Sequence, residues 1–287
     1  MKDLKEYINK AGLEGWALPH FNFSNAETLR AIIEAAYDLK SPILVATSEG
    51  ERKFIGPRQA VALVQAFRDE YGIPIFLNAD HTKSWEKTKE AVDLGYDAVL
   101  IDASHLNFKE NIELTKKVVE YAKKKNQAII VEGELGLLRG ESKIQEYVEV
   151  KEEDLTRPEQ AEEFVQKTKV DLLAPSVGNV HGVVTKSQQH VRPDLIEKIK
   201  NAIGDVGIVL HGASGVLLEE IAEAIEKGVS VIHINTEIRI AFTEGLRKAL
   251  AEDSKEVVPY KYLGKAKEMT KKAVLEKIKS FGSAGKI

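Results

Sequence analysis

Eight short apolar runs, rich in β-forming residues, alternate with amphipathic segments along this chain, and that alternation limits its fold more than any other feature. Most runs are apolar throughout rather than at every second residue, which predicts strands buried on both faces. The predicted strands cover residues 16–22, 42–47, 73–78, 98–102, 128–134, 172–177, 207–210 and 229–235. Eight strands separated by helices favour an α/β fold of the closed (β/α)8 type, a TIM barrel, over an open doubly wound sheet.

The segments between the strands carry apolar residues at helical spacing. They predict helices over residues 25–39, 84–94, 108–125, 158–167, 192–202 and 217–227. Ser24, with Glu27 three residues later, resembles a capping box, and Pro158 falls where a first helical residue would lie. Residues 260–279 predict one or two extra C-terminal helices, which are candidates for subunit contacts.

Composition limits the classes of function. The chain has 287 residues, 43% of them apolar, which suits a single barrel domain over residues 1–287. A net charge of -4 argues against nucleic acid as the main partner, and no apolar run approaches membrane-spanning length. The N-terminal run MKDLKEYINKAG is typical of an amphipathic helix rather than a signal peptide, so we expect a cytoplasmic protein. With no cysteine, any transition metal must be held by His, Asp or Glu.

One connection is too long for a simple turn. It runs over residues 136–155, and with the preceding Leu135 it reads LGLLRGESKIQEYVEVKEEDL. The segment is rich in charged residues and contains glycines. Long connections of this kind often cover active sites. We therefore expect a mobile flap with a functional role.

Titratable side chains stand at the ends of several predicted strands, where a barrel enzyme places its catalytic groups. Asp80 and His81 follow the third strand, His181 follows the sixth and His211 follows the seventh. A single strand-end histidine more often has a structural role, but three that converge on one rim suit a zinc site with an open coordination position. Such an ion polarises a carbonyl and stabilises a developing enolate as a Lewis acid.

Small residues directly after the seventh strand give a second signal. The run HGASGV, from His211 to Val216, lets backbone N–H groups approach a phosphate beside a helix N-terminus. Asn235 and Thr236, at the end of the eighth strand, could complete the same site. The spacing differs from the G-x-S-x-G of a nucleophile elbow, so we do not expect a serine nucleophile.

Acidic residues give a third signal. Asp102 ends the fourth strand, and Glu132 and Glu134 lie near the end of the fifth. Strand alternation points both glutamates to one face, toward the barrel interior. Buried glutamates need partner charges or a metal, so they predict a second, weaker cation site or salt bridges. His20, in the first strand, is expected to be packed.

At these residues the sequence strongly resembles the class II, zinc-dependent fructose-bisphosphate aldolase family, which includes tagatose-bisphosphate aldolases. The resemblance covers nearly the whole chain, through FNFSNAET, SPILVATSEG, NADHTKS, IDASHLNFKENI, VEGELG, TRPEQAEEFV, LLAPSVGNVHG, LHGASG, INTEIRIAF and FGSAGK. It implies a (β/α)8 barrel that performs reversible aldol cleavage of a ketose 1,6-bisphosphate to dihydroxyacetone phosphate and glyceraldehyde 3-phosphate, in glycolysis or gluconeogenesis. It also implies a homo-oligomer, either a dimer or a tetramer.

The resemblance further implies roles for individual residues. Asp80 would be the acid/base that handles the proton on the hydroxyl of the carbon being cleaved. The ligands of the catalytic Zn²⁺ would be His81, His181 and His211. Positions that hold a second divalent ion in some members match Asp102 and Glu134. Substrate contacts match Asn22, Ser48, Gly182, Gly212, Ala213, Ser214, Asn235 and Thr236, and Gly182 also matches a site for Na⁺ or K⁺.

This chain departs from the family pattern at several positions. His233 stands where an asparagine is usual, and Asn235 stands where many fructose-type members carry Asp and tagatose-type members often carry Ala. In the flap, Glu141 is the nearest candidate for the acid/base that the family's acidic cluster supplies. Thr185 stands where a lysine is common, with Lys186 one residue later. Two alternatives stay open: cleavage of tagatose 1,6-bisphosphate or another ketose phosphate on the same machinery, and a phosphosugar-binding barrel without catalysis.

Overall fold

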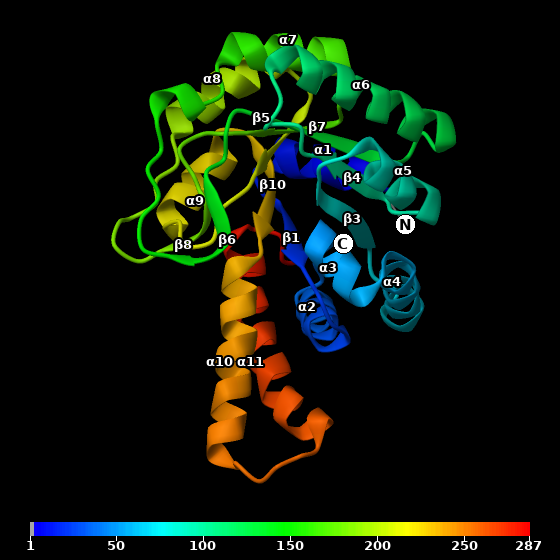
Figure 1. Ribbon diagram of the computed structural model, residues 1–287, viewed down its shortest axis with the longest axis vertical. Helices are drawn as coiled ribbons and strands as arrows, with labels where there is room; N and C mark the ends of the chain where they lie inside the picture. The colour runs from blue at the N-terminus through cyan, green and yellow to red at the C-terminus, as the bar shows by residue number, and fades with distance from the viewer. Residues whose placement is uncertain (1–2) are drawn as a thin grey trace.

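A computed structural model describes residues 3–287 and shows eight parallel strands closed into a barrel, with helices around it (Figure 1). Around the barrel the strands are β1 (Leu18–Asn22), β10 (Val229–Ile234), β9 (Gly207–Leu210), β7 (Leu172–Pro175), β5 (Ile130–Leu135), β4 (Ala98–Ile101), β3 (Ile75–Thr82) and β2 (Ile43–Thr47). Each strand overlaps one of the eight predicted runs. The predicted (β/α)8 barrel is therefore confirmed.

Helices cover the outer face of the barrel, where the apolar side chains of both layers form the main core. They are α2 (Ala26–Asp38), α3 (Glu49–Ile55), α4 (Pro57–Tyr71), α5 (Trp85–Leu94), α6 (Phe108–Lys125), α7 (Pro158–Thr168), α8 (Pro193–Ile203), α9 (Leu218–Glu226) and α10 (Thr236–Glu252). Helices α3, α4 and α10 were not predicted. Pro158 begins α7 as expected, but Asn25 rather than Ser24 caps α2, because its side chain accepts the backbone N–H of Thr28. The prediction of a capping box at Ser24 was therefore wrong.

Helix α1 (Leu4–Glu14) closes the amino end of the barrel, in agreement with the amphipathic pattern of the N-terminal run. Its apolar face, which includes Tyr7, packs on interior side chains from the starts of the strands, such as Ile130 of β5. Residues two and four positions along the same strand share that inward face. These are Glu132 and Glu134, which are buried as predicted. The barrel interior is thus apolar at its amino end and polar at its carboxyl end.

Two short strands outside the barrel, β6 (Gly140–Gln145) and β8 (His181–Val184), pair in parallel beside the carboxyl end of the barrel strands. Residues 136–155, which we call the flap, therefore contain a strand as well as the 3-10 turn Glu152–Asp154. Gly140 pairs with His181 in this small sheet. Main-chain pairing thus joins the flap to the segment that carries a candidate metal ligand.

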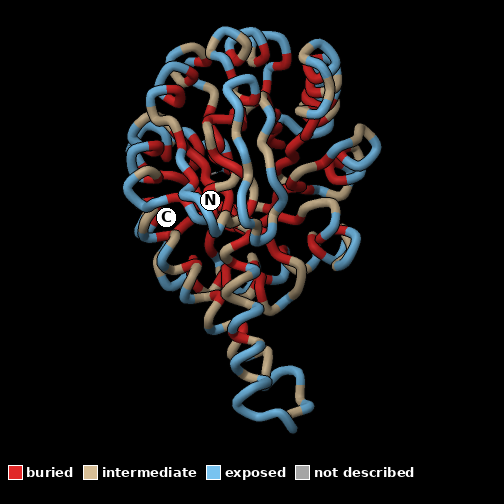
Figure 2. The backbone as a smooth tube through the Cα atoms, turned by 60° about the vertical axis from the view of Figure 1, so that its left-hand side comes forward, coloured by how far each residue is buried: buried red, intermediate tan, exposed pale blue. Residues whose placement is uncertain are grey.

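The chain ends in a helical hairpin. Helix α10 packs along α11 (Pro259–Ser280), and the far end of the pair projects beyond the barrel (Figure 2). The predicted C-terminal helical segment is therefore one continuous helix, which also packs against α2. Within residues 3–287, no helix combines the length and the apolar character that a bilayer crossing requires.

Gly133 allows two outer helices to approach the strand that carries both buried glutamates. A Cβ at Gly133 would lie 2.8 Å from the ring of Phe164 in α7 and 3.2 Å from the Thr115 side chain in α6. We expect Gly133→Ala to lower the free energy of unfolding by about 1–3 kcal/mol, because the added methyl group overpacks this layer. Urea denaturation would measure the change.

Gly264→Ala is the matched control for this prediction. Gly264 lies in α11, and no atom lies within 4 Å of the position that its Cβ would take. Replacement there should leave stability unchanged or raise it by up to about 1 kcal/mol, because alanine favours helices. Equal stability of Gly133→Ala and the wild type would contradict the close packing described here.

Candidate active site

A cavity of about 300 Å³ opens at the carboxyl end of the barrel strands. Its lining comes from strand ends on several sides of the barrel and from the flap. The predicted site residues that line it are Asn22, Ser48, Asp80, His81, Asp102, Glu141, His181, Gly182, His211, Gly212, Ser214, Asn235 and Thr236. Two other predicted residues, Ala213 and Glu134, are buried and are not part of this lining. The fold thus gathers nearly all of the predicted residues around one cavity.

The end of β3 departs from a regular strand, and this turns both members of the Asp80–His81 pair toward the mouth. Regular alternation would point neighbouring side chains to opposite faces. The pairing of β3 with β4 shifts register between Ala79 and Thr82, and His81 has a positive φ of 39°. The guanidinium of Arg52 supports the irregular end by donating to the carbonyl oxygen of Asp80 (3.2 Å) and the hydroxyl of Thr82 (2.8 Å). Strained backbone of this kind is typical of functional sites.

The three predicted ligand rings meet at this mouth. The ring centroid of His81 lies 4.8 Å from that of His181 and 4.8 Å from that of His211, and the last two are 6.4 Å apart. Nε2 of His81 lies 3.1 Å from Nδ1 of His211. Two nitrogens on one tetrahedral zinc ion lie roughly 3.4 Å apart, given bonds of about 2.1 Å. These two nitrogens are therefore placed as ligands of one ion would be.

Carboxylates stand behind two of these rings. Nε2 of His211 lies 2.6 Å from Oε1 of Glu132. Nδ1 of His81 lies 3.3 Å from Oδ2 of Asp102 and 3.5 Å from Oε2 of Glu134. Metal-ligating histidines typically donate their second nitrogen to a carboxylate, which fixes the tautomer and the ring orientation. The pattern directs the other nitrogen of each ring toward one point, where a metal ion would replace the hydrogen bond between the two rings.

The same carboxylates favour positive charge in the mouth. Burial would lower the pKa of His81, but Asp80, Asp102 and Glu134 outweigh it and raise that pKa to about 10. Burial raises the pKa of Glu134 to about 8, and the charge of Asp102 adds to the effect. Burial also lowers the pKa of His211 to about 3, which keeps that ring neutral with a free lone pair. Such a site is suited to a divalent cation.

Possible ligand atoms within residues 3–287 form four overlapping groups. The groups are Asp80 with His81 and His211; His81 with Asp102 and Glu134; Glu132 with His211 and His233; and His20 with Asp80 and His233. His181 belongs to none of them, although its ring lies beside that of His81. Oε2 of Glu134 is one of several buried side-chain oxygens without a hydrogen-bond partner, and the His81 ring lies 3.5 Å from it. Nitrogen and oxygen donors of this kind fit zinc at the imidazoles and a second cation near Glu134.

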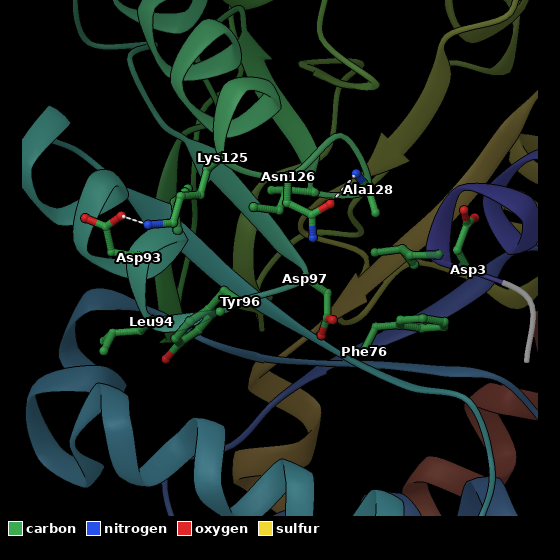
Figure 3. Close-up of a pocket in the computed structure, with 13 residues that line it drawn as sticks. Asp3, Phe76, Asp93, Leu94, Tyr96, Asp97, Lys125, Asn126 and Ala128 are labelled. Carbon is green, nitrogen blue, oxygen red and sulfur yellow. Dashed lines mark hydrogen bonds and ion pairs between the residues drawn. The ribbon is translucent and has the colours of Figure 1, made fainter.

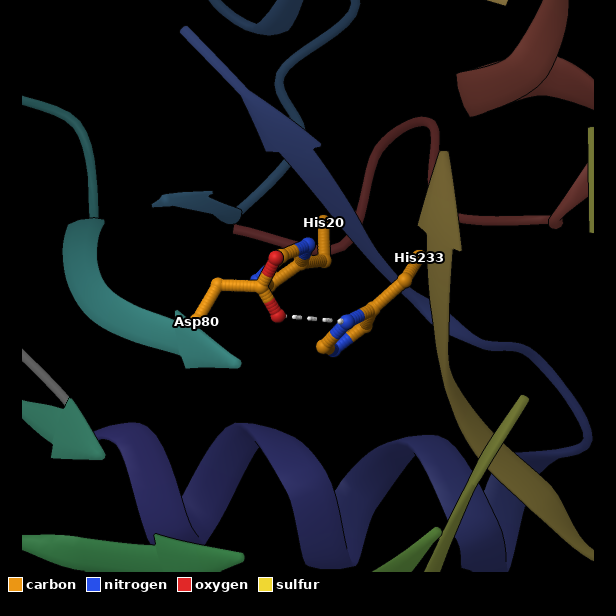
Figure 4. A group of neighbouring side chains, drawn as sticks. All are labelled: His20, Asp80 and His233. Atoms are coloured by element: carbon orange, nitrogen blue, oxygen red, sulfur yellow. Dashed lines mark ion pairs between the residues drawn. The ribbon is translucent and has the colours of Figure 1, made fainter. Parts of the chain in front are cut away.

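Two buried histidines from neighbouring strands stack face to face behind the mouth (Figure 4). His20 of β1 and His233 of β10 are paired in register, and their ring centroids lie 3.3 Å apart with planes only 3° from parallel. His20 is thus packed, as predicted. Nδ1 of His233 lies 3.5 Å from Oδ1 of Asp80, and its Nε2 lies 3.8 Å from Oε2 of Glu132. The stack fixes the ring of His233 between the candidate acid/base and the carboxylate behind His211.

Asp80 is held in the cavity wall from two sides. Its Oδ2 accepts a hydrogen bond of 2.9 Å from the Asn22 amide, and its Oδ1 faces His233. Burial works to raise the pKa of Asp80, but the surrounding imidazoles, His81 foremost, outweigh it and hold that pKa well below its usual range. The carboxylate is therefore ionised at neutral pH and can accept a proton.

The glycine loop after β9 reaches the same cavity through Gly212 and Ser214. Gly212 has a φ of 60°, and a Cβ there would lie 2.2 Å from a backbone carbonyl oxygen, so the position excludes larger residues. The N–H of Gly215 donates to Oε1 of Glu237 at 2.7 Å. An amide of this loop thus already binds a carboxylate, which fits the predicted affinity of the loop for a phosphate.

The flap touches both the cavity and the start of α10. The hydroxyl of Ser142 lies 3.1 Å from that of Thr236. Glu141, the candidate flap acid, is exposed and pairs with Lys143 at 2.7 Å. Gly182 has a φ of 89°, and a Cβ on it would lie 2.4 Å from the carbonyl oxygen of Glu141. Glycine at this position therefore permits the close approach of the flap to β8.

Some residues of the cavity were not predicted as site residues. They are Lys83, Gly140, Ser142, His233 and Arg239. His233 stood out only as a departure from the family pattern. Lys83 follows the Asp-His pair directly, so the expectation that functional residues stand at the carboxyl ends of barrel strands could have included it. Arg239 lies inside the first turn of α10, where a basic residue gives no sign in the sequence that it reaches a distant flap.

A second cavity, of about 350 Å³, lies at the amino end of the barrel (Figure 3). Its polar groups largely satisfy one another. Nζ of Lys125 lies 3.2 Å from Oδ1 of Asp93, and the side-chain oxygen of Asn126 accepts the N–H of Ala128 at 3.0 Å. Barrel enzymes keep their chemistry at the opposite end. The cavity at the carboxyl end is therefore the candidate active site.

Comparisons with known proteins cover the whole chain. A family model described as "Fructose-bisphosphate aldolase class-II" matches residues 2–286. The chain is 37% identical to a fructose-bisphosphate aldolase of Geobacillus stearothermophilus, over 99% of this chain and 97% of that protein. It is 36% identical to one of Thermus caldophilus, over 98% of each. The crystal structure of the YdjI aldolase from Escherichia coli K12 matches with a TM-score of 0.84 at 30% identity, over 100% of this chain and 99% of that one.

Metal affinity should depend on both the rings and the carboxylates behind them. We expect His211→Ala to abolish stoichiometric zinc binding, because it removes one of the two converging nitrogens. We expect Glu132→Gln to weaken zinc binding roughly 10–100-fold, because an amide holds the ring of His211 less firmly. Titration against a chromophoric chelator would measure both affinities.

His190→Ala serves as the control for metal binding. His190 lies in a surface loop, its ring is exposed, and its Nδ1 lies 2.6 Å from Oε1 of Glu220 in α9. The zinc affinity of this variant should equal that of the wild type. Wild-type affinity in Glu132→Gln would mean that this carboxylate does not orient the ligand.

Proposed function

The chain belongs to the class II fructose-bisphosphate aldolase family, and from that membership we propose that it cleaves fructose 1,6-bisphosphate reversibly to dihydroxyacetone phosphate and glyceraldehyde 3-phosphate. One observation carries the proposal: Nε2 of His81 and Nδ1 of His211 lie 3.1 Å apart in the same cavity as the ionised carboxylate of Asp80. Phosphosugar binding alone would require neither a proton acceptor nor converging metal ligands. The arrangement therefore supports an active lyase.

The cofactor that we propose is Zn²⁺, held by His81, His181 and His211. When bound, it would supply a Lewis acid for the negative charge that develops on the substrate carbonyl oxygen. Asp102 and Glu134 are our candidates for a second divalent ion, supported by the buried Oε2 of Glu134, which accepts no hydrogen bond. The backbone of Gly182 is the candidate contact for Na⁺ or K⁺.

We assign proton transfer to Asp80. As a base it takes the proton from the hydroxyl of the carbon beyond the scissile bond. The C–C bond then breaks, the aldehyde forms on that carbon, and the electron pair of the bond passes to the ketone half. In the direction of synthesis the protonated acid returns the proton to the aldehyde oxygen. The hydrogen bond from Asn22 holds the carboxylate in place for both directions.

The glycine loop is our candidate for binding the phosphate of the ketone half. Gly212 and Ser214 would contribute directly, Ala213 through its backbone N–H, and Thr236 at the start of α10 with the helix N-terminus. Asn22, Ser48 and Asn235 would then face the rest of the sugar chain. Glu141 is our candidate for moving the proton on the released ketone half, which requires its side chain to leave Lys143.

Removal of the metal tests the proposed reaction. We expect a chelator to abolish cleavage of fructose 1,6-bisphosphate and added zinc or cobalt to restore it, because charge on the carbonyl oxygen would have no other strong acceptor. A coupled assay for dihydroxyacetone phosphate would follow the rate. Turnover that resists chelation would reject the metal-dependent mechanism.

The same assay separates the related substrates. Comparison of kcat/KM for fructose 1,6-bisphosphate, tagatose 1,6-bisphosphate and a deoxy-ketonate phosphate would identify the preferred one. His233 and the flap without an acidic cluster make this comparison informative. Zinc-loaded protein that binds dihydroxyacetone phosphate without exchanging the proton of its hydroxymethyl carbon would instead be a binding protein.

Asp80→Ala tests the assignment of proton transfer. We expect turnover to fall by about two to four decades, the usual contribution of general acid–base catalysis, with the zinc content unchanged. Steady-state kinetics together with metal analysis would measure both quantities. Near wild-type turnover would remove Asp80 from the mechanism.

Assembly into a dimer or tetramer and a cytoplasmic location stay predictions.

A further inference from the structure

The side chain of Glu51, in α3, is almost fully buried between the active cavity and the start of α10. We propose that Glu51 is a positioning residue that joins the candidate acid/base Asp80 to the flap through two separate sets of contacts. Its kinetic consequences rest on the aldolase function proposed above.

The first set of contacts leads to the candidate acid/base. Oε2 of Glu51 accepts hydrogen bonds from the Asn22 amide at 2.9 Å and from the backbone N–H of Ser48 at 2.7 Å. The same amide nitrogen of Asn22 lies 2.9 Å from Oδ2 of Asp80. Asn22, which is one of the two side chains that hold the Asp80 carboxylate, is therefore itself held between two carboxylates, and its position depends on Glu51.

The second set of contacts leads to the flap. Oε1 of Glu51 lies 2.5 Å from one terminal nitrogen of Arg239 and 3.5 Å from the amide nitrogen of Asn235. The other terminal nitrogen of Arg239 donates to the carbonyl oxygen of Ser142, in β6, at 3.0 Å. Arg239 is partly exposed, whereas Glu51 is buried, so the buried carboxylate fixes the orientation of the guanidinium. We call the Glu51–Arg239–Ser142 contacts the latch.

A helix-capping role alone does not account for this geometry. A glutamate at the third position of a helix normally accepts the N–H of the capping residue, as Glu51 does for Ser48. That role uses one oxygen at the helix surface. Here the carboxylate is buried and its second oxygen is paired with a guanidinium. A buried carboxylate with a charged partner is costly unless its hydrogen bonds are complete, so the paired geometry indicates a role beyond the cap.

The residues that Glu51 holds form one wall of the active cavity. Asn22, Asn235 and Arg239 line both that cavity and an adjoining one of about 280 Å³, which Glu51 also lines. The carboxylate thus stands at the partition between the two spaces. A change at Glu51 would alter the part of the wall formed by Asn22, Asn235 and Arg239 without replacing a proposed metal ligand.

Two substitutions at Glu51 separate its contacts. Glu51→Gln keeps one oxygen for Asn22 and Ser48 but turns an N–H group toward Arg239, so we expect KM for the best substrate to rise about tenfold with a smaller fall in kcat. Glu51→Ala removes both sets, so kcat should also fall about tenfold or more. Zinc stoichiometry should stay at the wild-type value in both variants.

The latch can be measured without any substrate. Trypsin should cleave after Lys143, in β6, about tenfold faster in both Glu51 variants and in Arg239→Gln, because the flap then lacks a firmly held Arg239 and keeps only the Ser142–Thr236 hydroxyl contact with α10. If Glu51 acts on KM through Arg239, adding Glu51→Gln to Arg239→Gln should raise KM by less than about twofold more. A further tenfold rise, or cleavage at the wild-type rate in the Glu51 variants, would overturn the latch.

Asp171→Asn is the matched control. Asp171 also carries a carboxylate that is only 8% exposed and paired with a cation, Lys123 at 2.7 Å, but it precedes β7 at the amino end of the barrel. It should lose stability without a change in KM, in kcat or in cleavage of the flap. If Glu51→Ala behaves like Asp171→Asn, Glu51 is structural only. If the wild type cleaves no ketose phosphate while trypsin still detects the latch, the proposed function fails and the latch remains.

Discussion

A cluster of buried carboxyl groups at one end of the barrel is the constraint on which the rest of the site depends. Asp80, Asp102, Glu132 and Glu134 are each less than 8% exposed and gather at the carboxyl end of the barrel. Burying a carboxylate without a partner costs several kcal/mol, so such a cluster requires nearby positive charge or hydrogen-bond donors. The contacts within residues 3–287 supply mostly imidazoles and the amide of Asn22. Two of those imidazoles turn their remaining nitrogens toward each other, and a divalent cation at that point would complete the charge balance.

This constraint links metal binding to stability. A site made of carboxylates and imidazoles repels itself or takes up protons when no cation is bound, as the raised pKa of His81, about 10, indicates. Metal affinity then contributes to the free energy of the folded state, because the unfolded chain lacks the preformed site. The apolar layer at the amino end, where α1 packs on the starts of the strands, can hold the barrel together independently of the metal. The interior of the barrel is therefore divided along its axis into an apolar half and a half that accommodates charge.

Local patterns in the sequence predicted the strands and most of the candidate site, and distant contacts account for what they missed. Alternation in β5 correctly predicted that Glu132 and Glu134 point into the barrel, because the direction of both side chains is set within one strand. The register of β1 against β10, which stacks His20 on His233, joins opposite ends of the chain and leaves no local sign. The strand in the flap was missed because its partner, β8, is distant and its residues are largely exposed.

The irregular end of β3 and the position of Glu51 were missed for related reasons. Strand periodicity assumes a regular backbone, whereas the register shift near His81 depends on support from Arg52 in a different element. Glu51 has the sequence context of an ordinary helix cap, and only the fold brings Arg239 to its second oxygen. Sequence patterns thus specify which residues carry chemistry more readily than they specify the residues that orient them.

His233 links the proposed proton transfer by Asp80 to the proposed metal binding by His211. Its ring faces the carboxylate of Asp80 on one side and that of Glu132 on the other, and Glu132 in turn orients His211. A neutral imidazole carries one proton, so it can donate to only one of these carboxylates at a time. Any rearrangement of His233 therefore alters the candidate proton acceptor, Asp80, and the candidate metal ligand His211 together. Effects of substitutions at these positions should be strongly non-additive, because each residue acts on a shared network rather than on one step.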